Sequence, residues 1–163
     1  MVNFMQASLI DKKTLYTYLE EIKDPEVPVL SIIDLGIVRD VKLNGDELEV
    51  IITPTYTGCP AMDMISMNIK MALLENGYNN VKVTSVLSPA WSTDWMSEAG
   101  KRKLKDYGIA APDKKFVIPK NGVECPLCNS TNTRLVSEFG STACKALYQC
   151  NDCKEPFDYF KCH

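Results

Sequence analysis

The chain has 163 residues, of which 45% are hydrophobic and 24% are charged, and its formal net charge is −3. That length can bury a core in one medium domain or two small ones. The sequence has no long uncharged apolar run, and its start lacks a basic region followed by a hydrophobic block. It therefore predicts neither a transmembrane helix nor a signal peptide. The acidic balance disfavours nucleic-acid binding, and seven cysteines with metal-type spacing favour a reducing compartment, the cytoplasm.

The first helix and a hairpin are predicted between residues 12 and 53. The residues at helical spacing are Leu15, Tyr18, Leu19 and Ile22. Asp24-Pro25 is expected to end that helix, because proline disfavours a helical conformation in the residue before it. Residues 37–43 and 48–53 then flank Asn44-Gly45, which is a strong hairpin signal.

A second helix, a third strand and a third helix follow. The residues that share the face of the second helix are Ala61, Ile65, Ile69, Ala72 and Leu73. Gly77 is expected to cap its C-terminus, and residues 81–87 have a strand pattern. A weaker helical pattern runs roughly from Asp94 to Tyr107 and stops at Gly108. The order of elements predicts an α+β fold, a small sheet with helices on one face.

Four cysteines near the C-terminus form the clearest motif, Cys125-Pro-Leu-Cys128 and Cys150-Asn-Asp-Cys153. Two residues between thiols let one tight turn aim both sulfurs at one point, so two such turns can supply a tetrahedral Zn²⁺ site. Four protein ligands leave no open coordination position, which indicates a structural metal in a mostly β zinc ribbon. Iron is the alternative metal. Cys144, or Cys162 beside His163, could also replace one of these thiols or form a second site.

Helix stops and turn residues between Tyr107 and Gly122 predict a division of the chain. We expect an α+β domain over 1–110, a linker over 111–121 and a zinc-ribbon module over 122–163. A module of that size needs the metal as a staple, and its core is expected to be separate from the core of the first domain.

Cys59 is a candidate functional thiol in the first domain. A strand is expected to end at Thr53 and a helix to begin near Pro60, which places Cys59 at the helix N-cap. Unpaired backbone amides and the helix dipole would lower the pKa of a thiol there. The alternative is that Cys59 is a small apolar residue that fills the top of the sheet.

Three motifs in this domain resemble the iron–sulfur-assembly-associated domain of SufT-type proteins. They are Asp24-Pro-Glu-Val-Pro, Ser31-Ile-Ile-Asp34-Leu-Gly-Ile-Val and Thr53-Pro-Thr-Tyr-Thr-Gly-Cys59-Pro, and the resemblance covers about residues 12–107. With residues 88–98, 139–150 and 155–163, the whole chain resembles the PaaD family, the accessory subunits of bacterial phenylacetyl-CoA epoxidase.

The resemblance implies a non-catalytic accessory factor in phenylacetate catabolism, whose partners would be the oxygenase and reductase components of the epoxidase. It implies that Cys59 handles iron or an iron–sulfur cluster transiently, with Asp34 and Thr55 as candidate neighbours. Asp34 could equally cap a turn, and Thr55 could serve only to hydrogen-bond the backbone. One thiol cannot hold a cluster, so cluster chemistry would need a homodimer, a partner protein or a small ligand.

Two other function classes compete with this interpretation. A thiol-dependent enzyme or redox protein could use Cys59, but no histidine base lies near it in the sequence. A nucleic-acid-binding ribbon is disfavoured by the net charge. The chain has a single histidine and no glycine-rich nucleotide motif, so the sequence does not predict a diiron or nucleotide site. Trp91, Trp95 and the aromatic residues of the tail predict either packing or a partner surface.

Overall fold

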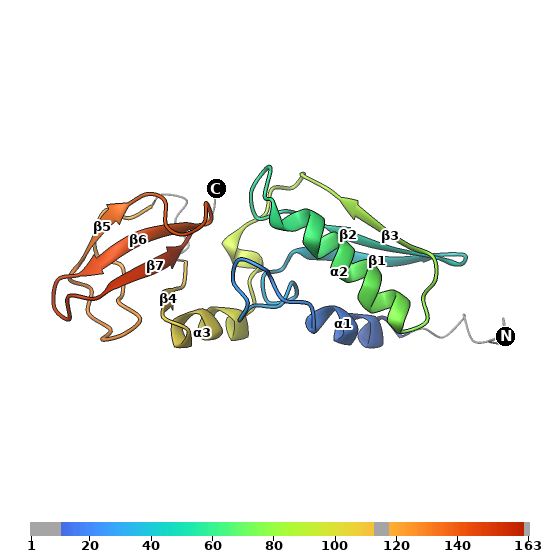
Figure 1. Ribbon diagram of the computed structural model, residues 1–163, viewed down its shortest axis with the longest axis horizontal. Helices are drawn as coiled ribbons and strands as arrows, with labels where there is room; N and C mark the ends of the chain where they lie inside the picture. The colour runs from blue at the N-terminus through green and yellow to red at the C-terminus, as the bar shows by residue number, and fades with distance from the viewer. Residues whose placement is uncertain (1–10, 113–117, 162–163) are drawn as a thin grey trace.

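Two β-sheets organise the computed structural model, which describes residues 11–112 and 118–161 (Figure 1). The first sheet has the order β1-β2-β3, with strands Val38–Asn44, Glu47–Ile52 and Val81–Ser85. The second has the order β4-β7-β6-β5, and in chain order its strands are Ile109–Ala110, Thr133–Ser137, Lys145–Cys150 and Pro156–Phe160. The expected mixed α+β fold is confirmed.

The predicted hairpin forms the antiparallel pair β1 and β2, and Gly45 in its turn has φ +67°. Leu48, Val50 and Ile52 are buried and alternate with half-buried residues, as a strand with one core-facing side requires. Strand β3 pairs parallel to β2 and ends at Ser85, two residues before the expected end. Its last partner is Ile52, where β2 itself ends.

Helix α2, Ala61–Glu75, connects β2 to β3 and lies along one face of the first sheet (Figure 1). Its buried residues are Ala61, Ile65, Ile69 and Leu73. Gly77 follows with φ +92°, which confirms the expected glycine at the helix end. Helix α1, Lys12–Glu20, packs against α2, and the Asp11 carboxylate caps it by accepting from the Lys13 N–H.

The third helix is divided, whereas the sequence predicted a continuous one. A 3₁₀ turn, Thr93–Trp95, precedes α3, Glu98–Asp106. Between them Met96 has extended backbone and a buried side chain. Burial of Met96 in the core therefore interrupts the helix, and the Ser97 hydroxyl caps a new one by accepting from the Gly100 N–H at 2.8 Å.

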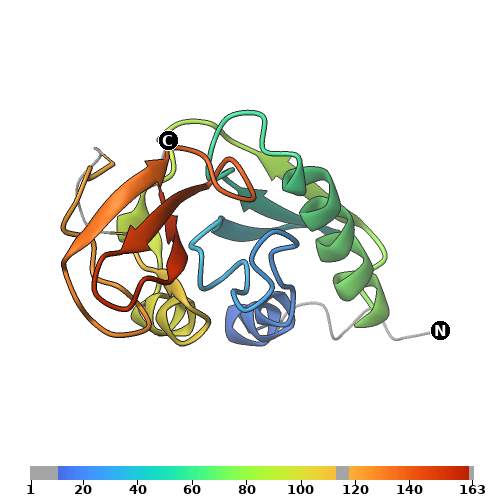
Figure 2. The same cartoon turned by 60° about the vertical axis from the view of Figure 1, so that its left-hand side comes forward.

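One hydrophobic core extends across both sheets, although the sequence predicted separate cores. Cys144 and Phe160, from the ribbon half of the chain, belong to the same buried cluster as Leu35 and Trp91. The Trp91 and Phe160 rings meet edge to face with centroids 6.1 Å apart, and the Trp91 indole donates to the Leu35 carbonyl at 2.8 Å. The loop between α1 and β1 lies between the sheets (Figures 1 and 2).

A second, smaller cluster fills the ribbon, and the expected division at residue 110 does not coincide with the packing. Strand β4, placed in the first domain by the sequence, pairs parallel to β7 in the second sheet. The members of this cluster are Ala110, Val123, Cys125, Ala146, Tyr148, Cys150, Phe157 and Tyr159. The domain bounds stay a prediction, and the buried contacts cross them.

Most of the aromatic residues that the sequence offered as a partner surface are internal. Trp91 is 3% exposed, and Phe157, Tyr159 and Phe160 are buried, so packing explains them better than a partner surface does. Trp95 is half-buried beneath the Arg39 guanidinium, 3.5 Å from the ring centroid.

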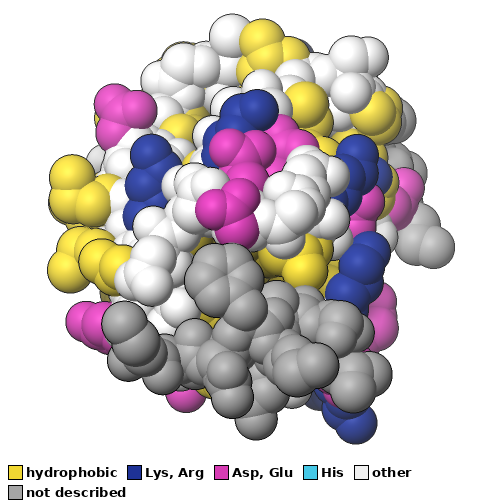
Figure 3. Space-filling model, turned by 90° about the vertical axis from the view of Figure 1, so that its right-hand side faces the viewer, with side chains coloured by type: hydrophobic (Ala, Val, Ile, Leu, Met, Phe, Trp, Pro, Cys, Tyr) yellow, Lys and Arg dark blue, Asp and Glu magenta, His cyan; other side chains and the backbone are white. Residues whose placement is uncertain are grey.

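Charges of both signs are interspersed on the described surface visible in Figure 3. None of the helices within 11–112 and 118–161 is long and apolar enough to cross a bilayer.

Candidate metal centre and thiol cluster

The sulfurs of Cys125, Cys128, Cys150 and Cys153 lie within 4.8 Å of one another. Two of their separations are 3.8 Å, between Cys125 and Cys153, and 3.6 Å, between Cys128 and Cys150. A tetrahedron with Zn–S bonds of about 2.3 Å has sulfurs about 3.8 Å apart, so the cluster matches the size of a metal site. The structure brings together all four predicted ligands.

Two tight turns position these sulfurs. In the first, the Asn129 N–H donates to the Cys125 carbonyl at 2.8 Å and the Cys125 N–H donates to the Ser130 carbonyl at 2.9 Å. Asn129 and Lys154, each directly after a second cysteine of a pair, have φ of 61° and 68°. This left-handed residue reverses the chain, so that the following amides face the sulfurs.

Side chains also join the two turns. Asp152 accepts from the Ser130 hydroxyl and, at 2.8 Å, from the Asn132 side chain, while the Asn151 N–H donates to the Asn132 carbonyl at 2.8 Å. Backbone N–H groups of Cys153 and Asp152 lower the pKa of the Cys150 thiol to about 7. Four cysteine sulfurs in this arrangement suit a closed tetrahedral metal such as zinc or iron.

Cys59 lies directly before α2, but the expected low pKa is wrong. Pro60 already has helical φ and ψ, α2 begins at Ala61, and the Cys59 side chain is 9% exposed. Burial raises the pKa of the Cys59 thiol, and the hydrogen bonds from the Ala61 N–H and the Tyr56 hydroxyl only partly offset it. Glu26 and Asp24 raise this pKa further through their negative charge. Desolvation thus outweighs the helix N-terminus.

Cys144 lies in the same buried cluster as Cys59, a relationship that the sequence did not predict. Its thiol donates to a Glu26 carboxylate oxygen at 3.4 Å and lies 3.0 Å from the Thr142 hydroxyl. Burial raises the pKa of Cys144 to about 12, and the Glu26 charge adds to that effect. The pKa of the Tyr56 hydroxyl, which hydrogen-bonds Cys59, is also raised. Burial has the largest effect, and the charges of Cys59, Glu26 and Cys144 add to it.

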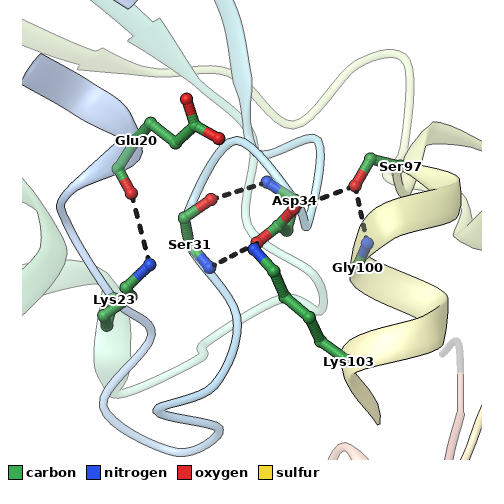
Figure 4. Close-up of polar contacts among 7 residues, drawn as sticks. All are labelled: Glu20, Lys23, Ser31, Asp34, Ser97, Gly100 and Lys103. Carbon is green, nitrogen blue, oxygen red and sulfur yellow. Dashed lines mark hydrogen bonds and ion pairs between the residues drawn. The ribbon is translucent and has the colours of Figure 1, made fainter. Parts of the chain in front are cut away.

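Asp34 occupies a different place, at the contact between a loop and α3 (Figure 4). One carboxylate oxygen accepts from the Lys103 ammonium at 2.6 Å and the Ser31 N–H at 3.1 Å, and the other accepts from the Ser97 hydroxyl at 3.0 Å. Burial would raise the pKa of Asp34, but Lys103 and the Ser31 and Ser97 donors together lower it. This geometry favours the turn-capping interpretation, because the acidic groups that act on Cys59 are Glu26 and Asp24.

Thr55 is buried and lines a cavity of about 50 Å³ together with Thr53, Tyr56 and Trp91. The Thr53 hydroxyl, also on this cavity, is buried and has no hydrogen-bond partner within the part of the chain that the structure describes. The cavity is large enough for about one water molecule. Tyr56, which follows Thr55 in the chain and also lines this cavity, hydrogen-bonds the Cys59 thiol.

Comparison with known proteins divides the chain between two families. Residues 12–86 match the family described as iron-sulfur cluster assembly protein, and residues 111–161 match the PaaD zinc beta ribbon domain. A protein of Escherichia coli K12, named as a putative subunit of 1,2-phenylacetyl-CoA epoxidase, is 48% identical over 151 residues, which is 91% of each chain.

Two solved structures resemble the fold. A domain of unknown function DUF59 from Bacillus anthracis is 34% identical with a TM-score of 0.53, and the match covers 56% of this chain and 89% of that one. A conserved hypothetical protein from Thermotoga maritima is 28% identical with a TM-score of 0.50, covering 58% of this chain and 94% of the other.

Proposed function

This chain belongs to the PaaD family of 1,2-phenylacetyl-CoA epoxidase subunits, and we propose that it is a non-catalytic accessory factor of that epoxidase in phenylacetate catabolism. Its task is to assist maturation of the enzyme's iron or iron–sulfur centres. The oxygenase and reductase components are its partners. The similarity of nearly the whole chain to the Escherichia coli protein supports the link to the epoxidase. The match of residues 12–86 to the iron-sulfur cluster assembly family supports the role in maturation.

The observation that carries this proposal is the position of Cys59. The thiol lies before α2, inside the assembly-type half, and shares one buried cluster with Cys144 of the ribbon half. Cysteine thiolates are the usual protein ligands of iron–sulfur clusters. A buried, protonated thiol suits transient capture, because it stays inert until a metal displaces its proton.

The ribbon supplies structure rather than chemistry in this proposal. Cys125, Cys128, Cys150 and Cys153 hold one Zn²⁺ with no open position, so the metal stabilises the second sheet. Since Phe160 of that sheet packs on Trp91, the zinc also supports the hydrophobic core that the two halves share.

A thiol-dependent enzyme fits the geometry less well. A nucleophilic cysteine needs a lowered pKa or an adjacent base, whereas burial raises the pKa of both Cys59 and Cys144. The Glu26 charge raises the pKa of both thiols further, and neither the Tyr56 hydroxyl at Cys59 nor the Lys145 charge near Cys144 offsets the effect of burial.

Reconstitution of the epoxidase tests the proposal. Apo oxygenase and reductase subunits are loaded with iron and sulfide with and without this chain, and metal content and epoxide formation are measured. We expect wild type to raise both, Cys59→Ser to fail, and the control Thr57→Ala, an exposed change in the same turn, to behave as wild type. Equal iron content with and without the chain would refute a maturation role. Lost subunit association at full iron content would assign the chain to assembly instead.

A further inference from the structure

Helix α2 carries a row of exposed apolar side chains on the side that faces away from the core. This methionine stripe consists of Met64, Met67, Met71 and Leu74, whose exposed fractions lie between 52% and 62%. The helix itself lies at the periphery of the fold (Figure 2). Single exposed apolar residues are common on protein surfaces, but several that form one continuous row mark an interaction surface.

The methionine stripe has the spacing of a coiled-coil seam. Its members are three, four and three residues apart, which is the pattern of positions a and d in a heptad written abcdefg. The buried residues Ile65, Ile69 and Leu73 then occupy positions b, f and c, on the opposite side of the helix. A helix that is apolar on both sides is normally covered on both. The core covers one side of α2, and the other side fits a second helix.

Two charged residues that border the stripe indicate which helix that is. Lys70 occupies position g and Glu75 position e, both are exposed, and neither has an ion-pair partner within the part of the chain that the structure describes. In a parallel pair of helices, position g of one faces position e of the other, five residues later. Lys70 of each copy of α2 would therefore face Glu75 of the other copy. In an antiparallel pair the g positions face each other, and the two Lys70 side chains would repel.

We infer that the methionine stripe is a homodimer surface, on which the α2 helices of two copies of this chain pack side by side in parallel. The inference does not rest on the proposed function. A two-fold axis between the helices brings each member of the stripe against itself and forms the Lys70–Glu75 pair twice. Methionine suits such a surface, because its flexible side chain adapts to its partner.

The length of the stripe sets the strength of this dimer. From Met64 to Leu74 it spans about 15 Å, at a rise of about 1.5 Å per residue. Interfaces that bury less than about 1,200 Å² in total are typical of weak or transient association. We therefore expect a reversible dimer that forms as the protein concentration rises.

Sedimentation equilibrium of the zinc-loaded full chain, from micromolar to millimolar protein, tests the inference. The wild type should pass from the monomer mass to the dimer mass. Met67→Glu and Met71→Glu should each raise the dissociation constant of the dimer about tenfold or more, because a carboxylate would be buried in the seam. Val136→Glu, an equivalent change at an exposed residue of β5, is the control and should dimerise as wild type does. Glutamate is a good helix former, and retained zinc with an unchanged circular dichroism spectrum shows that each variant is folded.

Exchange of the bordering charges tests the orientation of the helices. Lys70→Glu and Glu75→Lys should each raise the dissociation constant about fivefold, because two attractive pairs become repulsive. The double variant, in which both charges are exchanged, should dimerise as wild type does.

Three results would overturn the inference. A wild type that stays monomeric at millimolar protein would exclude the dimer, even if Met67→Glu then failed in reconstitution of the epoxidase, which would assign the stripe to another subunit. Unchanged dimerisation of Met67→Glu and Met71→Glu would place the dimer contact elsewhere. A double charge variant as weak as either single variant would exclude the parallel arrangement.

Discussion

Lys103 on α3 donates to the Asp34 carboxylate at 2.6 Å, and this ion pair joins the third helix to the loop before β1 (Figure 4). The Asp34 side chain is 6% exposed and the Lys103 side chain is 41% exposed. The carboxylate therefore matters more than the ammonium, because its loss would leave the buried Ser31 N–H without its acceptor.

We expect Asp34→Ala to lower the free energy of unfolding by about 2–4 kcal/mol, and Lys103→Ala by about 1 kcal/mol or less. Urea denaturation followed by circular dichroism measures both. Because folding lowers the pKa of Asp34, the carboxylate stabilises the protein fully above its unfolded pKa of about 3.9. This stabilisation is lost as the pH falls through the lower folded pKa. The difference between wild type and Asp34→Asn should thus be constant near neutral pH and shrink in acid, and a constant difference down to about pH 2 would contradict it.

Removal of the ribbon metal should disturb both halves of the molecule. In Cys125→Ser, or after chelation, the four-cysteine site is lost, β7 loosens and Phe160 no longer covers Trp91. We expect loss of bound zinc and a red shift of tryptophan fluorescence, because Trp91 becomes exposed to water. The control Val136→Ser changes an exposed residue of β5 and should leave both signals unchanged. Zinc loss with unchanged fluorescence would show that the first half packs independently.

Cys59 should react slowly with iodoacetamide at neutral pH. Its burial and raised pKa keep the thiol protonated, so its alkylation rate should lie below that of the same cysteine in the denatured chain and should rise with pH. Mass spectrometry of peptides from zinc-loaded protein gives the rates residue by residue. Cys59→Ser should cost about 1 kcal/mol or less of stability. Alkylation of native Cys59 faster than in the denatured chain would overturn this account of its environment.

Gly36 and Gly45 can be compared to measure how much a close backbone contact adds to the cost of replacing a glycine. Both have left-handed backbone, with φ of +68° and +67°. A Cβ on Gly36 would lie 2.2 Å from the Trp95 carbonyl oxygen, whereas a Cβ on Gly45 has no atom within 4 Å. We expect Gly45→Ala to cost about 1 kcal/mol from backbone strain alone, and Gly36→Ala to cost at least about 3 kcal/mol. Equal costs, measured by thermal or urea unfolding, would show that the chain near Trp95 can move aside.

Local patterns predicted most of the fold. Asn44-Gly45 and the alternation around Val50 depend on neighbours in sequence, and both predictions agree with the structure. The division of the third helix could not be predicted, because it depends on burial of Met96 by distant residues. The pairing of β4 with β7 is likewise a long-range contact without a local signal.

The candidate sites also differ in whether local sequence or long-range contacts determine them. The four ribbon cysteines could be found from sequence because each pair is set by one turn. Cys59 stays a candidate site, and the sequence predicted its pKa shift with the wrong sign, since a helix N-terminus can be seen in a sequence and burial cannot. The contact between Glu26 and Cys144 spans 118 residues, and only the fold brings it together.

The edge-to-face contact of Trp91 with Phe160 also constrains how the protein is made. Because Phe160 lies far downstream of Trp91 in the chain, this face of the Trp91 ring stays uncovered until β7 has been synthesised. During that interval the nascent chain presents the uncovered face of the Trp91 ring to solvent. The time between synthesis of Trp91 and synthesis of β7 therefore sets how long this apolar surface is exposed to aggregation.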